Sequence, residues 1–196
     1  MKNTLNSLFL GALVLASLTF TSCEKDELSS DFESVENLQE TPENLNKVNT
    51  ILPVSRYYSG GSNTVHTYQV LNLGVRHGTY EGRPFKLGTY DFISAPPSGT
   101  RQIFFLLAPG NKDFVMTTST SEKSNLLRRG WRDYSTKALY SNIKKAAYIH
   151  TGAGSGRVKL YRFYGASNTD HLYTTNYNEG ISAGYIYEGV IGYVYR

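Results

Sequence analysis

The sequence predicts an all-β domain built from three similar units, which follows a long N-terminal tether. Three observations support this fold class. The 196-residue chain contains 16 Tyr and 18 Gly but only 2 Met, and this composition favours strands and turns over helices. Every tyrosine lies after residue 56, which places a domain boundary near residue 50. Beyond that boundary, a pattern of aromatic, turn and glycine positions recurs about every 50 residues.

The N-terminus has the features of an export signal. Lys2 precedes a short apolar run over residues 8–20, and this run falls short of the ~20 residues that a membrane-spanning helix needs. Cys23, the only cysteine, follows the small residue Ser22. This arrangement resembles a bacterial lipoprotein signal, in which the cysteine is acylated and begins the mature chain. We expect a signal peptide over residues 1–22 and lipid attachment at Cys23. The alternative is an ordinary cleaved signal with an incidental cysteine.

Residues 23–50 are expected to form a disordered acidic tether. Residues 24–50 carry a net charge of −6, whereas residues 51–196 carry +9. The tether has too few apolar residues to form a core, and repulsion between its acids favours an extended conformation. Its first residues, 24–27, resemble the acidic export signal of Bacteroidota surface lipoproteins; a solvated charge run is the alternative. We therefore expect a lipid-anchored outer-membrane protein exposed at the cell surface, with the lipid as its only membrane contact.

The motifs after residue 50 predict a three-unit domain over residues 51–196. The third unit is the clearest, and it carries its motifs in a fixed order. They are Tyr161-Arg162-Phe163-Tyr164, a turn, Asp170-His171-Leu172-Tyr173-Thr174-Thr175 and Tyr185-Ile186-Tyr187-Glu188-Gly189. The first unit repeats most of them. The second lacks the His and the Tyr-Glu-Gly, but it keeps Asp113 and Glu122 at the positions of Asp170 and Glu179. The expected units span about 54–101, 102–157 and 158–196.

Three units with about four short strands each predict a closed body. A β-trefoil fits this unit number and length, and its closure removes free strand edges. Propellers typically use 4–8 units, and a sandwich with accidental internal similarity is the remaining alternative. In the third unit, residues 176–183 predict a helical turn or a loop. Residues 185–195 predict a further pair of strands with a bend or bulge at Gly189 or Gly192.

The motifs of the third unit resemble an uncharacterised family of tyrosine-rich repeat domains found in secreted bacterial and fungal proteins. Units of that family read aromatic-Arg-aromatic, then His-aromatic-Tyr-Thr-Thr, then Gly-Trp-x-Tyr-Glu-Gly. The match is strong over residues 160–196, moderate over 54–82 and weak over 102–134. Such domains are often attached to secreted hydrolases, so the resemblance implies a targeting or binding accessory. It implies no activity of its own.

Residues that recur in the first and third units are candidates for ligand binding. They are His66, Tyr80, Glu81, His171, Tyr173, Tyr185, Tyr187 and Glu188. Tyrosines at the rim, Tyr177 included, offer flat faces with a polar tip, which suits stacking on a pyranose ring. Each type of residue also has a structural alternative. The histidines would cap their own turns, the tyrosines would fill the core, and each glutamate would pair with the arginine of its own unit, Arg56 or Arg162.

The sequence contains no nucleophile elbow, zinc-protease motif, phosphate loop or dinucleotide fingerprint. A single cysteine also leaves no Cys-based zinc site. We expect no enzyme activity, no cofactor and no metal. A hydrolase would need two carboxyl groups within about 5–10 Å of each other, and symmetric repeats would place Glu81 and Glu188 far apart.

The leading hypothesis is therefore a lectin-like module that binds a glycan or surface polysaccharide without catalysis. The alternative is a protein-interaction or inhibitor module that presents an exposed loop, such as residues 91–101 or 151–157. The basic charge and the aromatics are also the ingredients of nucleic-acid binding. Export to a cell surface argues against that partner, so no nucleic acid is expected.

Overall fold

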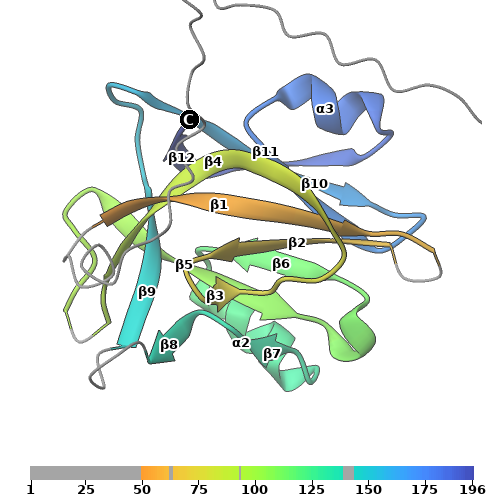
Figure 1. Cartoon of the computed structure of the whole chain (residues 1–196), viewed down its shortest axis with the longest axis horizontal. Helices are drawn as coiled ribbons and strands as arrows, with labels where there is room; N and C mark the ends of the chain where they lie inside the picture. Colours follow the sequence, from red (N-terminus) through yellow and green to blue (C-terminus); the bar gives the residue numbers. More distant parts are fainter. Residues whose placement is uncertain (1–49, 62–63, 93, 139–143) are drawn as a thin grey trace, which may run out of the picture. The chain divides into compact units, whose positions relative to one another are not determined.

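The computed structural model describes residues 50–61, 64–92, 94–138 and 144–196 (Figure 1). The expected signal peptide, Cys23 and the acidic tether lie outside the described residues. None of the described helices is long and apolar enough to cross a membrane.

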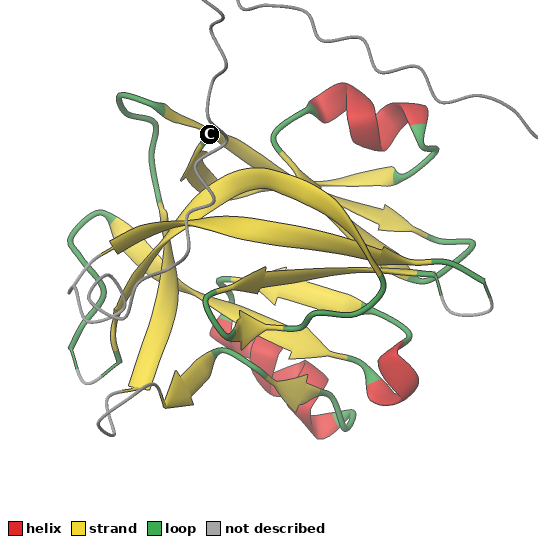
Figure 2. Cartoon of the chain, viewed as in Figure 1, coloured by secondary structure: helices red, strands yellow, loops and turns green. Residues whose placement is uncertain are grey.

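Strands dominate the described chain and follow a similar order three times (Figure 2). Unit 1 contains β1 (Thr50–Ser59), β2 (Val65–Val70), β3 (Leu73–Gly74) and β4 (Thr79–Asp91). Unit 2 contains β5 (Thr100–Leu107), a 3-10 turn (Pro109–Asn111), β6 (Phe114–Thr117), α2 (Thr120–Arg128), β7 (Arg132–Asp133), β8 (Thr136–Ala138) and β9 (Lys144–His150). Unit 3 contains β10 (Arg157–Gly165), β11 (Asp170–Thr174), α3 (Tyr177–Ser182) and β12 (Ile186–Tyr195). The predicted all-β class is confirmed.

Each unit has an opening strand that pairs antiparallel with a short partner strand and a return strand, and β5 of unit 2 also pairs with β7. The short partner strands are β2, β6 and β11, and the long return strands are β4, β9 and β12. The return strands also pair with one another, β4 with β9, β9 with β12 and β12 with β4. The three partner strands contact one another as well. The units are thus joined cyclically, which is compatible with the expected trefoil-like closure.

The last segment of unit 3 is one strand, not the two that the sequence suggested. Strand β12 runs from Ile186 to Tyr195, and two irregularities in its pairing with β10 leave Glu188 and Ile191 without partners in the register. Gly189 and Gly192 follow these residues and have positive φ angles of 142° and 158°. Glycine adopts such angles without a steric cost, so the expected bends are taken up as bulges within a continuous strand.

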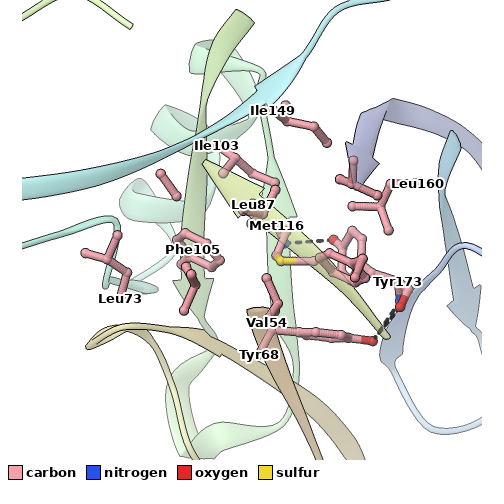
Figure 3. Close-up of a cluster of buried hydrophobic side chains, with 14 of the residues drawn as sticks. Val54, Tyr68, Leu73, Leu87, Ile103, Phe105, Met116, Ile149, Leu160 and Tyr173 are labelled. Atoms are coloured by element: carbon pink, nitrogen blue, oxygen red, sulfur yellow. Dashed lines mark hydrogen bonds between the residues drawn. The ribbon is translucent and has the colours of Figure 1, made fainter. Parts of the chain in front are cut away.

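The main hydrophobic core draws buried side chains from all three units (Figure 3). Tyr68 of β2, Met116 of β6 and Tyr173 of β11 occupy equivalent positions, and all three are fully buried. The Tyr68 hydroxyl donates to the Tyr173 carbonyl at 3.1 Å and accepts from the Tyr173 amide at 2.8 Å. The Tyr173 hydroxyl accepts from the Met116 amide at 2.8 Å. Tyr68 of unit 1 and Tyr173 of unit 3 therefore each form a hydrogen bond with the backbone of another unit inside the core.

Removal of one of these buried hydroxyls is expected to lower the stability of the fold. Tyr68→Phe removes a group that satisfies a buried amide and a buried carbonyl, so we expect it to lower the free energy of unfolding by about 1–3 kcal/mol. Tyr57→Phe is the matched control, because the Tyr57 ring is also buried and its hydroxyl makes no hydrogen bond to any described residue. Urea unfolding followed by circular dichroism measures both. Equal effects of the two substitutions would contradict this role of Tyr68.

Candidate functional site

Two matching polar clusters join unit 3 to the other two units. The 1–3 lock consists of Arg56, His66 and Glu81 of unit 1 with Asp170 and Glu179 of unit 3. The 2–3 lock consists of Arg162, His171 and Glu188 of unit 3 with Asp113 and Glu122 of unit 2. In each lock a histidine and an arginine of one unit meet two carboxylates of the other.

The 1–3 lock is centred on Asp170, which is fully buried. Its carboxylate accepts from the His66 backbone amide at 2.7 Å and lies 2.6 Å from His66 Nδ1. The Tyr185 hydroxyl donates to the same carboxylate at 2.6 Å. Nearby, Arg56 pairs with Glu81 at 2.9 Å and with Glu179 at 2.7 Å. These hydrogen bonds, chiefly the one from the His66 side chain, outweigh the effect of burial and lower the pKa of Asp170.

The 2–3 lock repeats this geometry. His171 Nδ1 lies 2.8 Å from Asp113 Oδ2, and His171 Nε2 lies 3.3 Å from Glu188 Oε2. Arg162 donates to Glu188 at 2.6 Å and pairs with Glu122 at 2.9 Å. Burial and the Arg162 guanidinium lower the pKa of His171, but the hydrogen bonds to Asp113 and Glu188 outweigh them and raise it to about 9. Arg162 Nη2 also lies 3.1 Å from His171 Nε2.

Local features of the chain place the four glutamates. Glu81 and Glu188 sit on equivalent bulges of β4 and β12, one residue before the glycine that pairs with the arginine. A bulge re-aims a side chain, and here both carboxylates reach the arginine of their own unit. Glu122 and Glu179 lie in the first turns of α2 and α3, where a negative charge is favoured by the helix dipole.

The junction between units 1 and 2 has apolar residues at the equivalent positions. Val65 stands where the other units have an aspartate, and Phe114 stands where they have a histidine. Phe105 occupies the position of the arginines. All three are fully buried. Unit 1 also has no helix among its described residues that would supply a glutamate. The molecule thus has two polar junctions and one apolar junction.

An exposed aromatic cluster lies on the outer face of unit 3. We call Tyr161, Tyr177 and Tyr187 the tyrosine platform. Their ring centroids lie 5.3 to 6.2 Å apart, and the buried Phe163 packs against Tyr177 and Tyr187 at 5.5 Å. Tyr177 and Tyr187 remain 40% and 41% exposed. Helix α3 supplies Tyr177, and strands β10 and β12 supply the other two (Figure 1).

The domain of unknown function DUF5648 matches this sequence over residues 19–142 and again over residues 53–195. The chain belongs to this family. The second match spans all three units, and the expectation of an uncharacterised family is confirmed. No curated protein and no solved structure matches the chain.

Several candidate residues of this DUF5648 domain have structural partners. The predicted ion pairs Glu81–Arg56 and Glu188–Arg162 are confirmed. The idea that His66 and His171 cap their own turns is wrong, because both rings face carboxylates of another unit. Tyr173 is fully buried. No group of three or more His, Cys, Asp or Glu suited to a metal ion exists among the described residues.

The remaining candidates differ in accessibility. Tyr187 belongs to the tyrosine platform. Tyr80 is its equivalent in unit 1 and is 53% exposed, but among the described residues its one aromatic neighbour is Tyr57, at 5.6 Å. Tyr185 is partly exposed and is held by Asp170. Of the candidate residues, Tyr187 alone is part of an exposed group of three aromatic rings.

The apolar junction predicts how the 2–3 lock will respond to substitution. Asp113→Val alone leaves a buried histidine without its main carboxylate, and His171→Phe alone leaves a buried carboxylate unpaired. We expect each to cost about 3–5 kcal/mol of unfolding free energy. The double variant places at the 2–3 junction the residue types that Val65 and Phe114 provide at the apolar junction. We therefore expect it to lower the free energy of unfolding by less than either single variant does. Additive losses in a double-mutant cycle would refute this equivalence.

His171 also makes stability depend on pH. Its folded-state pKa of about 9 exceeds the ordinary value of about 6.5, so its contribution is complete below about pH 6.5 and is lost as the pH rises through about 9. We expect the free energy of unfolding to fall over this window by an amount of the order of 2 kcal/mol. The measurement is urea unfolding across the window. The Asp113→Val, His171→Phe double variant serves as the control, and an equally steep fall in that variant would rule out His171 as the cause.

Proposed function

We propose that this DUF5648 domain is a non-catalytic carbohydrate-binding module, held at the outer-membrane surface by a lipid on Cys23. The tyrosine platform of unit 3 carries the proposal. Three sequence features support the proposal that the domain is displayed away from the membrane. They are the recurring unit motifs, the lipoprotein-like N-terminus and the acidic tether.

The platform has the properties of a sugar-stacking surface. The exposed faces of Tyr177 and Tyr187 offer flat apolar area, and their hydroxyls provide polar tips. The rings are held by aromatic contacts with each other and with Phe163. A surface ordered before binding loses little conformational entropy when a ligand docks.

A hydrogen-bonding group follows the platform residue Tyr187 in the sequence. Glu188 follows Tyr187 in β12, and its side chain is 34% exposed. Its Oε2 atom is engaged by Arg162 and His171, whereas Oε1 makes no hydrogen bond or ion pair with any described residue. A fixed and partly exposed carboxylate oxygen can accept a hydrogen bond from a sugar hydroxyl. In this arrangement Glu188 orients a ligand and performs no chemistry on it.

A protein partner is the second candidate function. The elements that carry the platform, α3 and β12, also carry three well-exposed apolar side chains: Ile181 at 47%, Ile186 at 58% and Val190 at 39%. Contiguous exposed apolar surface is typical of protein interaction sites. A folded protein that binds no glycan would favour this function.

The test is a glycan array probed with the full chain, with Cys23→Ser to prevent acylation. We expect binding to a defined glycan that persists at moderate salt. Tyr177→Ala and Tyr187→Ala should each weaken it at least about tenfold, because truncation of a central aromatic contact typically costs more than ~1.4 kcal/mol.

Phe92→Ala is the matched control, since Phe92 is 43% exposed and belongs to unit 1. It should leave affinity unchanged. Binding that is insensitive to both tyrosine substitutions would exclude the platform as the site.

A further inference from the structure

A hollow of about 320 Å³ lies between units 2 and 3. Arg101, Thr118, His150 and Thr151 of unit 2 line one side, and Val190 and Tyr193 of β12 line the other. Its volume falls at the lower end of the roughly 300–1,000 Å³ typical of small-molecule sites. None of the functional roles argued above uses it.

The hollow favours an anion. None of its lining residues is an aspartate or a glutamate. Arg101 is exposed and forms no ion pair with any described residue, so its guanidinium is available to a ligand. Thr118 and Tyr193 add hydroxyl groups that bond to no described residue. A guanidinium presents paired N–H donors that match the two oxygens of a carboxylate.

The hollow adjoins the tyrosine platform. Val190 lines the hollow and lies opposite Tyr161 in the pairing of β10 with β12. Directly opposed residues have Cβ atoms about 4.5–5.5 Å apart on one face of a sheet. Tyr161 in turn contacts Tyr177 and Tyr187. A ligand of two sugar rings can therefore occupy the platform and the hollow together.

We propose that the hollow binds the carboxylate of a uronic acid residue, with Arg101 as its cationic partner, next to the sugar ring stacked on the platform. This inference rests on the proposed carbohydrate-binding function and narrows it to acidic glycans. The net charge of +9 over residues 51–196 attracts such polymers to the domain as a whole, whereas Arg101 distinguishes a carboxylate from a neutral sugar.

The experiment compares oligouronates with their methyl esters, which share the backbone but lack the charge. Oligomers of galacturonate, glucuronate and mannuronate are titrated calorimetrically into the full chain with Cys23→Ser, at physiological salt. We expect at least one acid to bind about tenfold or more tightly than its ester. Arg101→Gln should remove this preference and leave the affinity for the ester unchanged.

Arg129→Gln is the matched control, because it removes the same charge from the exposed C-terminal end of α2. It should preserve the preference. Equal affinities for acid and ester, or a preference that Arg101→Gln leaves intact, would overturn the inference while glycan binding still stood. Absence of binding to any acid, ester or neutral glycan on the array would overturn both proposals. Thermal unfolding by circular dichroism verifies that each variant is folded.

Discussion

The arrangement of the three units depends on the neutralisation of buried carboxylates. Asp170 and Asp113 are both buried at unit junctions, and an unpaired charge there would destabilise the fold by several kcal/mol. Each is satisfied by a histidine of the adjoining unit. Both junctions also carry an arginine bound between two glutamates. A unit that shifted relative to its neighbour would break all of these contacts together, so the locks fix both distance and register.

The difference between the junctions gives the units a fixed order around the core. Three identical apolar junctions would let similar units pack in any cyclic order, because hydrophobic contact is not directional. Across the junctions, the histidine of unit 1 meets an aspartate of unit 3, and the histidine of unit 3 meets an aspartate of unit 2. Val65 and Phe114 leave the third junction without a charge that needs a partner. Specific polar contacts at two of the three junctions are therefore sufficient to determine which units meet at the third junction.

The sequence was informative about local features and less informative about contacts between units. Composition and alternation predicted the strands, and repeat alignment matched Asp113 with Asp170 and Glu122 with Glu179. That alignment also predicted the glutamate–arginine pairs, because both partners belong to one unit. The histidine contacts were missed because they join residues 104 and 58 positions apart. Charged residues three positions after Ser119 and Asn176, a typical helix-start pattern, were the available sign that Glu122 and Glu179 lie at helix starts. The hollow beside Arg101 depends on how two units pack, and no motif in the chain marks it.

The lock residues and the proposed binding surface lie on opposite faces of the same strands. In β10, Leu160 is fully buried and Arg162 is directed into the 2–3 lock, whereas Tyr161 faces outward to the platform. Successive side chains of a strand alternate between its two faces, so the residues of β10 that hold the units together and the platform residue Tyr161 lie on opposite faces. The 2–3 lock also orients Glu188, which follows the platform residue Tyr187 in the sequence, and it joins the two units that form the hollow. The rigidity of the proposed site therefore follows from the same buried charges that determine the fold.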